Sequence, residues 1–191
     1  MTGVGYNLPL LDTDVAEAKK MFDVNVFALV SVTKAFSPLL IASKGTIINI
    51  GSIAGKAPIP WQGYYNASKA AVNLLSDQLR LELAPFGVDC ICVVTGAIKT
   101  RFFDNALGVK LPAESLYTPG KDIIEAVTGG FLIVKYGMSV DLYAEGVVKN
   151  ALRRYPTKNQ WLGGSTGPIW FVGTFLWSTA WVSIAVLQYL R

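Results

Sequence analysis

The stretch GSIAGKAPIPWQGYYNASKAAV, residues 51–72, stands between an apolar run and a long helical pattern, and it decides the fold. The run that leads into it, GTIINIGS (45–52), is rich in β-branched residues and bounded by glycines. Such a run predicts a strand buried on both faces of a parallel sheet. The sequence YYNASKAAVNLLSDQLRLELAPFG (64–87) then predicts a helix that a proline and a glycine bring to an end. The strand therefore delivers Ser52 to a turn in front of this helix.

The rest of the chain alternates helices and strands around this unit. Apolar residues recur at helical spacing over residues 14–42, and VDCICVV (88–94) and NQWLGG (159–164) predict two further strands. This order predicts an α/β domain over residues 1–165, with a parallel sheet of the doubly wound, Rossmann type. The ligand crevice of such a sheet lies at the carboxyl ends of its strands, where Ser52 falls.

Composition excludes several classes of function. The chain has a net charge of +4, and its basic residues are scattered rather than clustered on one face, which gives no support for nucleic-acid binding. Histidine is absent, which excludes an imidazole base and most zinc sites, and we expect no metal site. Any catalysis must use Tyr, Lys, Ser, Asp or Glu.

The cysteines and the amino terminus indicate a cytosolic domain. Cys90 and Cys92 alternate on a predicted strand and so point to the same face, and we expect them to be buried and reduced. The first residues, MTGVGYNLPLLDTD, lack the basic and apolar regions of a signal peptide. We therefore expect this domain to face the cytosol.

The carboxyl-terminal segment has a different character. Residues 169–190 form a run of 22 without a charge, and 52% of the whole chain is hydrophobic. A helix of that length spans about 33 Å, enough to cross a hydrocarbon core of about 30 Å. Three of the five tryptophans lie in the run, and Arg153, Arg154 and Lys158 precede it. We expect a membrane-associated helix over residues 168–190, spanning the bilayer or lying in its interface. A buried core helix is the alternative.

Two residues at the start of the second helix suggest acid–base chemistry. Tyr65 and Lys69 are four positions apart and share one face of the helix, which places an ammonium beside a phenol. A nearby positive charge stabilises the phenolate and lowers the pKa of a tyrosine from about 10. Ser52 can donate a hydrogen bond to the same substrate oxygen. Because Tyr-x-x-x-Lys is common on amphipathic helices, the pair alone is not specific.

With its surroundings, this pair resembles the short-chain dehydrogenase/reductase family, in which Asn, Ser, Tyr and Lys form a catalytic tetrad. The matching segments are DVNVFALVSVTKAF with Asn25, IINIGSIAG with Ser52, and YNASKAAV with Tyr65 and Lys69. The resemblance implies that Tyr65 is the proton donor and that Ser52 holds the substrate carbonyl. It also implies that Lys69 lowers the pKa of Tyr65 and binds the nicotinamide ribose, and that Asn25 holds a water in a proton relay.

The resemblance extends to the cofactor loop. In the family the loop after the next strand contacts the nicotinamide carboxamide and phosphates; here it reads TGAIKT (95–100). Ile98 and Thr100 would therefore bind the cofactor together with Tyr65 and Lys69. The implied cofactor is NADP, with NAD left open. Thr95 replaces the usual proline, and with the apolar tail this is similar to a fungal subgroup related to 1-acyldihydroxyacetone-phosphate reductase. We therefore expect a membrane of the endoplasmic reticulum or a lipid droplet.

The match covers only the second half of the family's fold. The Gly-x-x-x-Gly-x-Gly turn that cradles the cofactor pyrophosphate is not found in the sequence. We expect the strand before Ser52 to form an unpaired apolar edge, and the chain as given to be truncated and inactive.

Two functions stay open at this stage. The first is an NADP-dependent oxidoreductase that interconverts a ketone and a secondary alcohol on a lipid-like or polyketide-like substrate. Its partners would be that small molecule and membrane lipid, and the family also allows a homo-oligomer. The second is a non-catalytic, membrane-anchored remnant that binds a partner or substrate.

Overall fold

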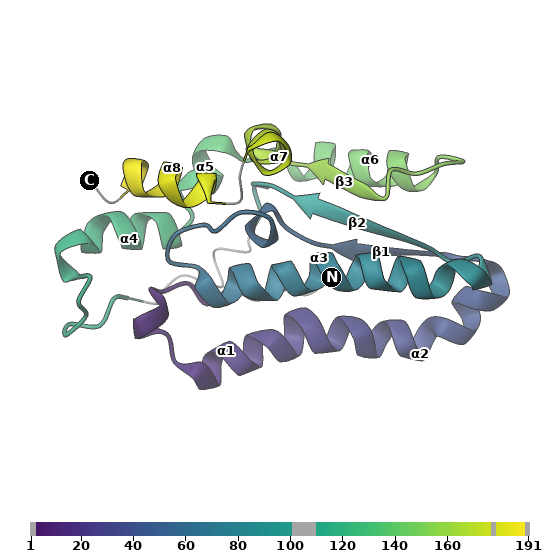
Figure 1. The fold of residues 1–191 in the computed structure, drawn as a ribbon, viewed down its shortest axis with the longest axis horizontal. Coiled ribbons are helices and arrows are strands. Elements are labelled where there is room, and N and C mark those ends of the chain that lie inside the picture. Colours follow the sequence, from purple (N-terminus) through teal and green to yellow (C-terminus); the bar gives the residue numbers. More distant parts are fainter. Residues whose placement is uncertain (1–2, 101–109, 177–178, 190–191) are drawn as a thin grey trace.

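A parallel sheet of three strands forms the centre of the molecule. The computed structural model describes residues 3–100, 110–176 and 179–189. The strands follow the order β1-β2-β3, and both neighbouring pairs are parallel (Figure 1). Their bounds are Thr46–Ile50, Asp89–Thr95 and Asn159–Leu162. The α/β class and the three predicted strands are confirmed.

The central strand β2 is buried on both faces. All of its residues from Cys90 to Val94 are at most 1% exposed, although successive side chains point to opposite sides of the sheet. Cys90 packs with Ile47 and Val88, and Cys92 with Ile53 and Val94. Both cysteines are free and buried, as the sequence predicts. Within the described residues β1 pairs only with β2, so it forms one edge of the sheet.

Two long helical segments line one side of the sheet, below it in Figure 1. The first comprises α1 (Val15–Phe22) and α2 (Ala28–Ser43), with five π-helical residues, Asp23–Phe27, between them. Asp14 caps α1 by accepting a hydrogen bond from the Ala16 backbone N–H at 2.7 Å. The sequence predicts one helix here, and the chain stays helical but widens into this π turn.

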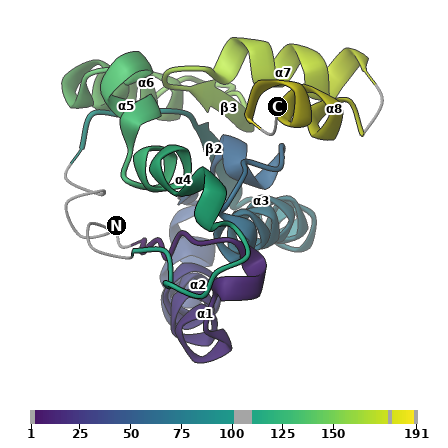
Figure 2. The same cartoon turned by 90° about the vertical axis from the view of Figure 1, so that its left-hand side faces the viewer.

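The second segment, α3 (Gly63–Leu83), packs against β2 and ends in the short 3-10 turn Ala84–Phe86. Three other 3-10 turns occur at Leu10–Asp12, Ile53–Gly55 and Thr118–Gly120. The helices after β2 are α4 (Lys121–Thr128), α5 (Phe131–Tyr136) and α6 (Val140–Ala151), and α6 packs against β3. Figure 2 shows these later helices on the side of the sheet away from α1 and α2.

The prediction of a single helix over residues 168–190 is wrong. The chain builds two helices of ten residues, α7 (Thr166–Phe175) and α8 (Ala180–Tyr189). Leu176 is extended, with φ −111° and ψ 167°, and this ends α7. Among the described residues, the one helical stretch that is long and apolar enough to cross a membrane is Val15–Ser43. The division of the chain near residues 165–168 stays a prediction.

A pair of glycine substitutions tests the packing of the turn after β1. A Cβ on Gly55 would lie 2.6 Å from the Ala70 backbone nitrogen of α3, and closer still to the Lys69 carbonyl. We expect Gly55→Ala to lower the free energy of unfolding by about 1–3 kcal/mol, because backbone atoms cannot yield as a flexible side chain can. Urea unfolding measures this.

Gly173→Ala is the matched control, because Gly173 lies inside α7 and nothing lies within 4 Å of a Cβ at that position. It should raise stability by about 0.5–1 kcal/mol through a lower entropy of the unfolded chain. Equal effects of the two substitutions would contradict the close approach of the turn to α3.

Candidate active site

Ser52 lies immediately after β1, at the carboxyl end of the sheet. Its hydroxyl caps the turn Ile53–Gly55 by accepting a hydrogen bond from the Ala54 backbone N–H at 3.1 Å. The Asn73 side chain of α3 donates to the Ser52 carbonyl at 3.2 Å, and Asn73 is itself buried. Ser52 is 8% exposed, so its position is fixed both by the local turn and by α3.

Tyr65 and Lys69 lie on the first turns of α3, facing Ser52. The hydroxyls of Tyr65 and Ser52 are hydrogen-bonded to each other. The Lys69 Nζ lies 5.9 Å from the centre of the Tyr65 ring and donates to the Ile50 carbonyl at 3.2 Å. The structure thus brings together three of the four predicted catalytic residues.

Asn25, the fourth, lies in the π-helical turn and is 4% exposed. Its amide group donates to the Val4 carbonyl at 2.9 Å and to the Ser68 hydroxyl at 3.2 Å, and accepts from the Val4 N–H at 3.0 Å. Ser68 in turn donates to the Tyr65 carbonyl at 2.8 Å. Asn25 therefore connects the amino-terminal segment to the helix of Tyr65. Its predicted role in holding a water stays a prediction.

Burial controls the protonation of the site. Desolvation raises the pKa of Tyr65 to about 12, and the hydrogen bond from Ser52 opposes this rise. Burial also lowers the pKa of Lys69. The sequence predicts that Lys69 lowers the pKa of Tyr65, but in this structure desolvation raises it, and the opposing effect comes from Ser52. Tyr65 is therefore protonated at neutral pH, which is the form that a proton donor needs.

The loop at residues 95–100 lies at the same edge of the sheet, after β2. Its backbone is fixed between Met138 and Gly164, each of which exchanges hydrogen bonds of 2.9 Å with Ala97 or Lys99. Ile98 is buried and Thr100 is exposed. The cofactor contacts expected for these two residues stay predictions.

Sequence reasoning missed three polar residues that position the site. Ser68 and Asn73 lie on either side of Lys69 in the sequence of α3. Serine and asparagine usually favour exposed positions, but these two side chains donate hydrogen bonds within the protein, to the Tyr65 and Ser52 carbonyls. Tyr143 of α6 shares a hydrogen bond of 2.7 Å with Thr95, the residue that replaces the family's proline. A polar residue on the predicted buried face of a helix is the one signal that could have found Ser68 and Asn73.

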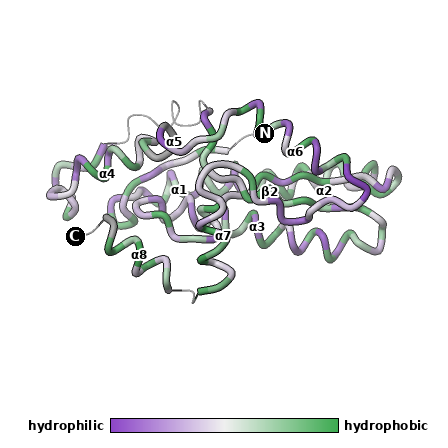
Figure 3. Tube along the Cα trace, turned by 90° about the horizontal axis from the view of Figure 1, so that it is seen from above, coloured by the Kyte–Doolittle hydropathy of each residue, from purple (hydrophilic) through white to green (hydrophobic). Residues whose placement is uncertain are grey.

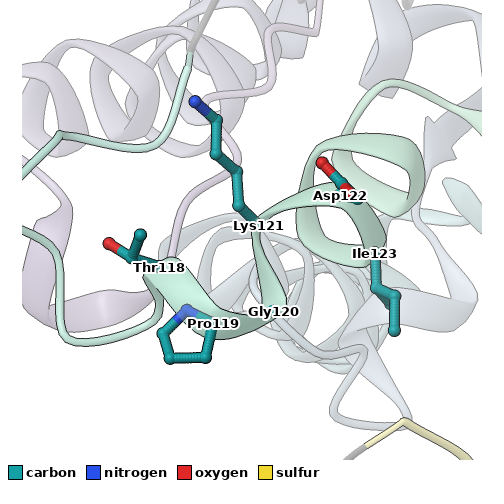
Figure 4. Close-up of a pocket in the computed structure, with 6 residues that line it drawn as sticks. All are labelled: Thr118, Pro119, Gly120, Lys121, Asp122 and Ile123. Carbon is teal, nitrogen blue, oxygen red and sulfur yellow. The ribbon is translucent and has the colours of Figure 1, made fainter.

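A separate hollow opens at the start of α4 (Figure 4). It includes none of the predicted catalytic residues, and its lining is the consecutive run Thr118, Pro119, Gly120, Lys121, Asp122 and Ile123. Within the described part of the chain, no group of three or more His, Cys, Asp or Glu side chains is placed to hold a metal ion.

Comparison with known proteins decides the family. The family model for short chain dehydrogenase matches residues 1–107, more than half of the chain and the part that contains Asn25, Ser52, Tyr65 and Lys69. The chain belongs to the short-chain dehydrogenase family. The family resemblance found in the sequence is therefore confirmed.

Relatives among curated proteins are fungal. The short-chain dehydrogenase virD of Hypocrea virens is 38% identical over 188 residues, which cover 94% of this chain and 61% of virD. The short-chain dehydrogenase ptmH of Penicillium ochrochloron is 42% identical over 152 residues, or 80% of this chain and 55% of ptmH. This short-chain dehydrogenase thus spans less than two thirds of the length of these relatives.

Solved structures show the same fold. A short-chain dehydrogenase from Streptomyces avermitilis is similar with a TM-score of 0.71 at 24% identity, over 88% of this chain and 61% of that one. A short chain dehydrogenase from Burkholderia cenocepacia, solved in complex with NADP, has a TM-score of 0.64 at 24% identity, over 100% of this chain and 69% of that one.

Removing the Asn25 side chain tests whether it connects the amino-terminal segment to α3. We expect Asn25→Ala to lower the free energy of unfolding by about 1–3 kcal/mol, because the Val4 N–H and C=O lose their partner. Hydrogen exchange followed by NMR should show faster exchange of the Val4 amide.

Asn150→Ala is the matched control. Asn150 is equally buried and bonds in both directions to the Thr157 backbone, at 2.9 and 3.0 Å, away from the site. It should speed exchange at Thr157 and leave Val4 protected. An unchanged Val4 amide in Asn25→Ala would show that this connection is not formed.

Proposed function

We propose that this chain carries the catalytic residues of an NADP-dependent oxidoreductase that interconverts a ketone and a secondary alcohol. The observation that supports this most directly is the hydrogen bond between the hydroxyls of Tyr65 and Ser52, beside the buried Lys69 ammonium. Membership of a dehydrogenase family agrees with the same chemistry. Because the chain spans only part of its relatives, the activity is proposed for the whole protein.

Each residue of the site has a distinct role in the proposed reduction of a ketone. A nicotinamide cofactor held beside Tyr65 and Lys69 would supply the hydride for the carbonyl carbon. Tyr65 donates its hydroxyl proton to the carbonyl oxygen, and its raised pKa keeps it in the protonated form that this step requires. The Ser52 hydroxyl hydrogen-bonds the same oxygen and orients the carbonyl. The positive charge of Lys69 stabilises the phenolate that Tyr65 becomes, and the reverse reaction returns the proton.

Lys69 also fits the ribose of a nicotinamide nucleotide. An ammonium has three donors, and within the described residues Lys69 uses one of them, toward the Ile50 carbonyl. The two others are available to ribose hydroxyls next to Tyr65. We propose NADP as the cofactor, with NAD left open; a structural relative of the same fold was solved in complex with NADP.

Apolar side chains around the site favour a lipid-like or polyketide-like substrate. Ile53 follows Ser52 directly, and Ile59 and Trp161 pack in the same cluster. Trp61 lies with Leu8 in a second apolar cluster, four residues before Tyr65. A substrate with an apolar body would bury its surface against these side chains.

Replacing Tyr65 tests the proposed function. A chimera that adds the unmatched part of virD to this chain supplies the portion of the fold that the chain does not cover. In it, Tyr65→Phe should lower kcat for ketone reduction by about 10²- to 10⁴-fold, because the general acid is lost. NADPH binding, measured by fluorescence titration, should stay nearly unchanged.

Tyr64→Phe is the control, since Tyr64 is the adjacent tyrosine on α3 and has no role in the proposed chemistry. Near-normal turnover of Tyr65→Phe would overturn the assignment. NADPH binding without turnover in the unsubstituted chimera, against a panel of apolar ketones, would favour a non-catalytic binding protein instead.

We further propose that the protein associates with a membrane of the endoplasmic reticulum or a lipid droplet, with its catalytic part in the cytosol. Support comes from the uncharged run at residues 169–190 and from the exposed apolar side chains of α7 and α8. Association as a homo-oligomer remains compatible with this placement.

Ending the chain after Ile169 tests the membrane proposal. This end point keeps Ile169, which packs against the Ile53 cluster, and removes most of α7 and all of α8. The shortened protein should move from the membrane fraction to the soluble fraction, because the main exposed apolar segment is gone. If it still sediments with membranes, the anchor lies elsewhere, and Val15–Ser43 is the next segment to test.

A further inference from the structure

The two carboxyl-terminal helices are each too short to cross a bilayer. Ten helical residues span about 15 Å, half of a hydrocarbon core of about 30 Å. The break at Leu176 also falls inside the uncharged run. If residues 169–190 crossed the membrane, this non-helical backbone would lie in hydrocarbon, where unpaired N–H and C=O groups cost several kcal/mol each.

Both helices lie at the surface of the molecule. None of the α7 residues is buried, and in α8 the one buried residue with a described side chain is Ala180. In Figures 1 and 2 the pair lies in the uppermost layer, and Figure 3 shows it from above. The large exposed apolar side chains of the two helices are Trp170, Phe171, Phe175, Val182, Ile184, Val186 and Leu187.

The distribution of these side chains favours lipid over a protein partner. The exposed residues Val182, Ile184 and Leu187 cover an arc of about 200° around α8, at 3.6 residues per turn. A protein groove covers a stripe of about 100°, and the rim of a protein interface carries charged residues. From Asn159 to Leu190 the sequence has no charge at all. Lipid can cover such a surface on every side.

The tryptophans indicate the orientation. In a spanning helix, Trp and Tyr concentrate near the two interfaces and leave the centre aliphatic. Here Trp170, Trp177, Trp181 and Tyr189 are spread along the whole run. An element that lies along the interface keeps these aromatic rings at headgroup depth. The indole N–H of Trp181 differs in its contact with water, because it is buried within the protein.

We propose that α7 and α8 form a monotopic membrane element that lies within one leaflet, with both of its ends on the side of the catalytic domain. The inference rests on the membrane association proposed above and decides how the segment is placed. It also places the site close to lipid, because Ile169 at the start of α7 packs in one cluster with Ile53. An apolar substrate could then reach Ser52 from the leaflet.

The position of the carboxyl terminus tests this placement. The full chain, with an epitope after Arg191, is bound to microsomes and floated through a density gradient, and the sealed vesicles are treated with protease. We expect the protein to float and the epitope to be digested, while a lumenal marker protein survives. A protected epitope would show a spanning helix and overturn the proposal. Failure to float would instead overturn the membrane association itself.

Two exposed leucines supply a matched pair for the lipid contact. Leu187 of α8 is 57% exposed, and Leu116, in the loop before α4, is 81% exposed. Binding is measured to neutral phosphatidylcholine vesicles, which isolates the apolar contribution. Leu187→Glu should weaken binding at least about tenfold, because a carboxylate would enter the acyl region. Leu116→Glu should bind vesicles like the unsubstituted protein. Both variants should have the same free energy of unfolding as the unsubstituted protein.

Val182→Glu separates lipid from a second copy of the chain. Val182 lies about 140° from Leu187 around α8, so a groove would contact only one of them, whereas lipid contacts both. We expect Val182→Glu to weaken vesicle binding as Leu187→Glu does. If one substitution alone had an effect, or if either dissociated a dimer without changing vesicle binding, the surface would be a protein interface and the proposal would fall.

Discussion

The close approach of the turn at residues 51–55 to the backbone of α3 is the constraint on which the rest of the site depends. A Cβ on Gly51 would collide with Asn73, and one on Gly55 with the Lys69 carbonyl, so the turn can reach the helix only with glycine at both positions. Because β1 and β2 are parallel, this turn lies at the carboxyl end of the sheet. The approach then places the Ser52 hydroxyl within hydrogen-bond distance of Tyr65. The connection from Asn25 through Ser68 to the Tyr65 carbonyl supports the same helix from its other side.

Burial sets the chemistry that this geometry makes possible. Tyr65 and Lys69 both lose water, which favours the neutral form of each and opposes the transfer of a proton between them. A charge that develops during reaction would therefore be stabilised mainly by fixed neighbours, namely the Ser52 hydroxyl and the Lys69 side chain. Several buried polar side chains near them are paired, with Asn49 bonded to Ser76 and Asn73 to the Ser52 carbonyl. Paired groups of this kind hold a site rigid because breaking any one bond leaves a buried partner unsatisfied. The Oδ1 of Asn66, next to Tyr65 in the chain, is buried without a hydrogen bond among the described residues.

Some of the many apolar residues of the chain are buried and others are exposed. One part forms the sheet core, where β2 is covered on both faces. Another part stays exposed on α2, whose residues include none that are buried, and beside β1, which is an edge strand within the described residues. The chain spans 61% of virD, and an edge strand next to an apolar helix is the type of surface that further chain can cover. Helices α7 and α8 lie on the far side of the sheet from α2 (Figure 2).

The sequence by itself determined the three strands, the two long helical segments before and after β1, and the family. It also identified Ser52 at a predicted strand end and Tyr65 and Lys69 at a helix start. These follow from local physics: β-branched runs form buried strands, a four-residue spacing puts Tyr65 and Lys69 on one face, and a turn after a strand holds Ser52. Only the tertiary structure decided the pKa of Tyr65, because desolvation depends on what packs around the phenol. Desolvation raises this pKa, whereas the spacing of Tyr65 and Lys69 predicts a lower one. The same holds for Ser68, Asn73 and Tyr143, whose partners come from other elements. It also holds for the break between α7 and α8, since an uncharged run specifies that a segment avoids water but not whether its helix continues.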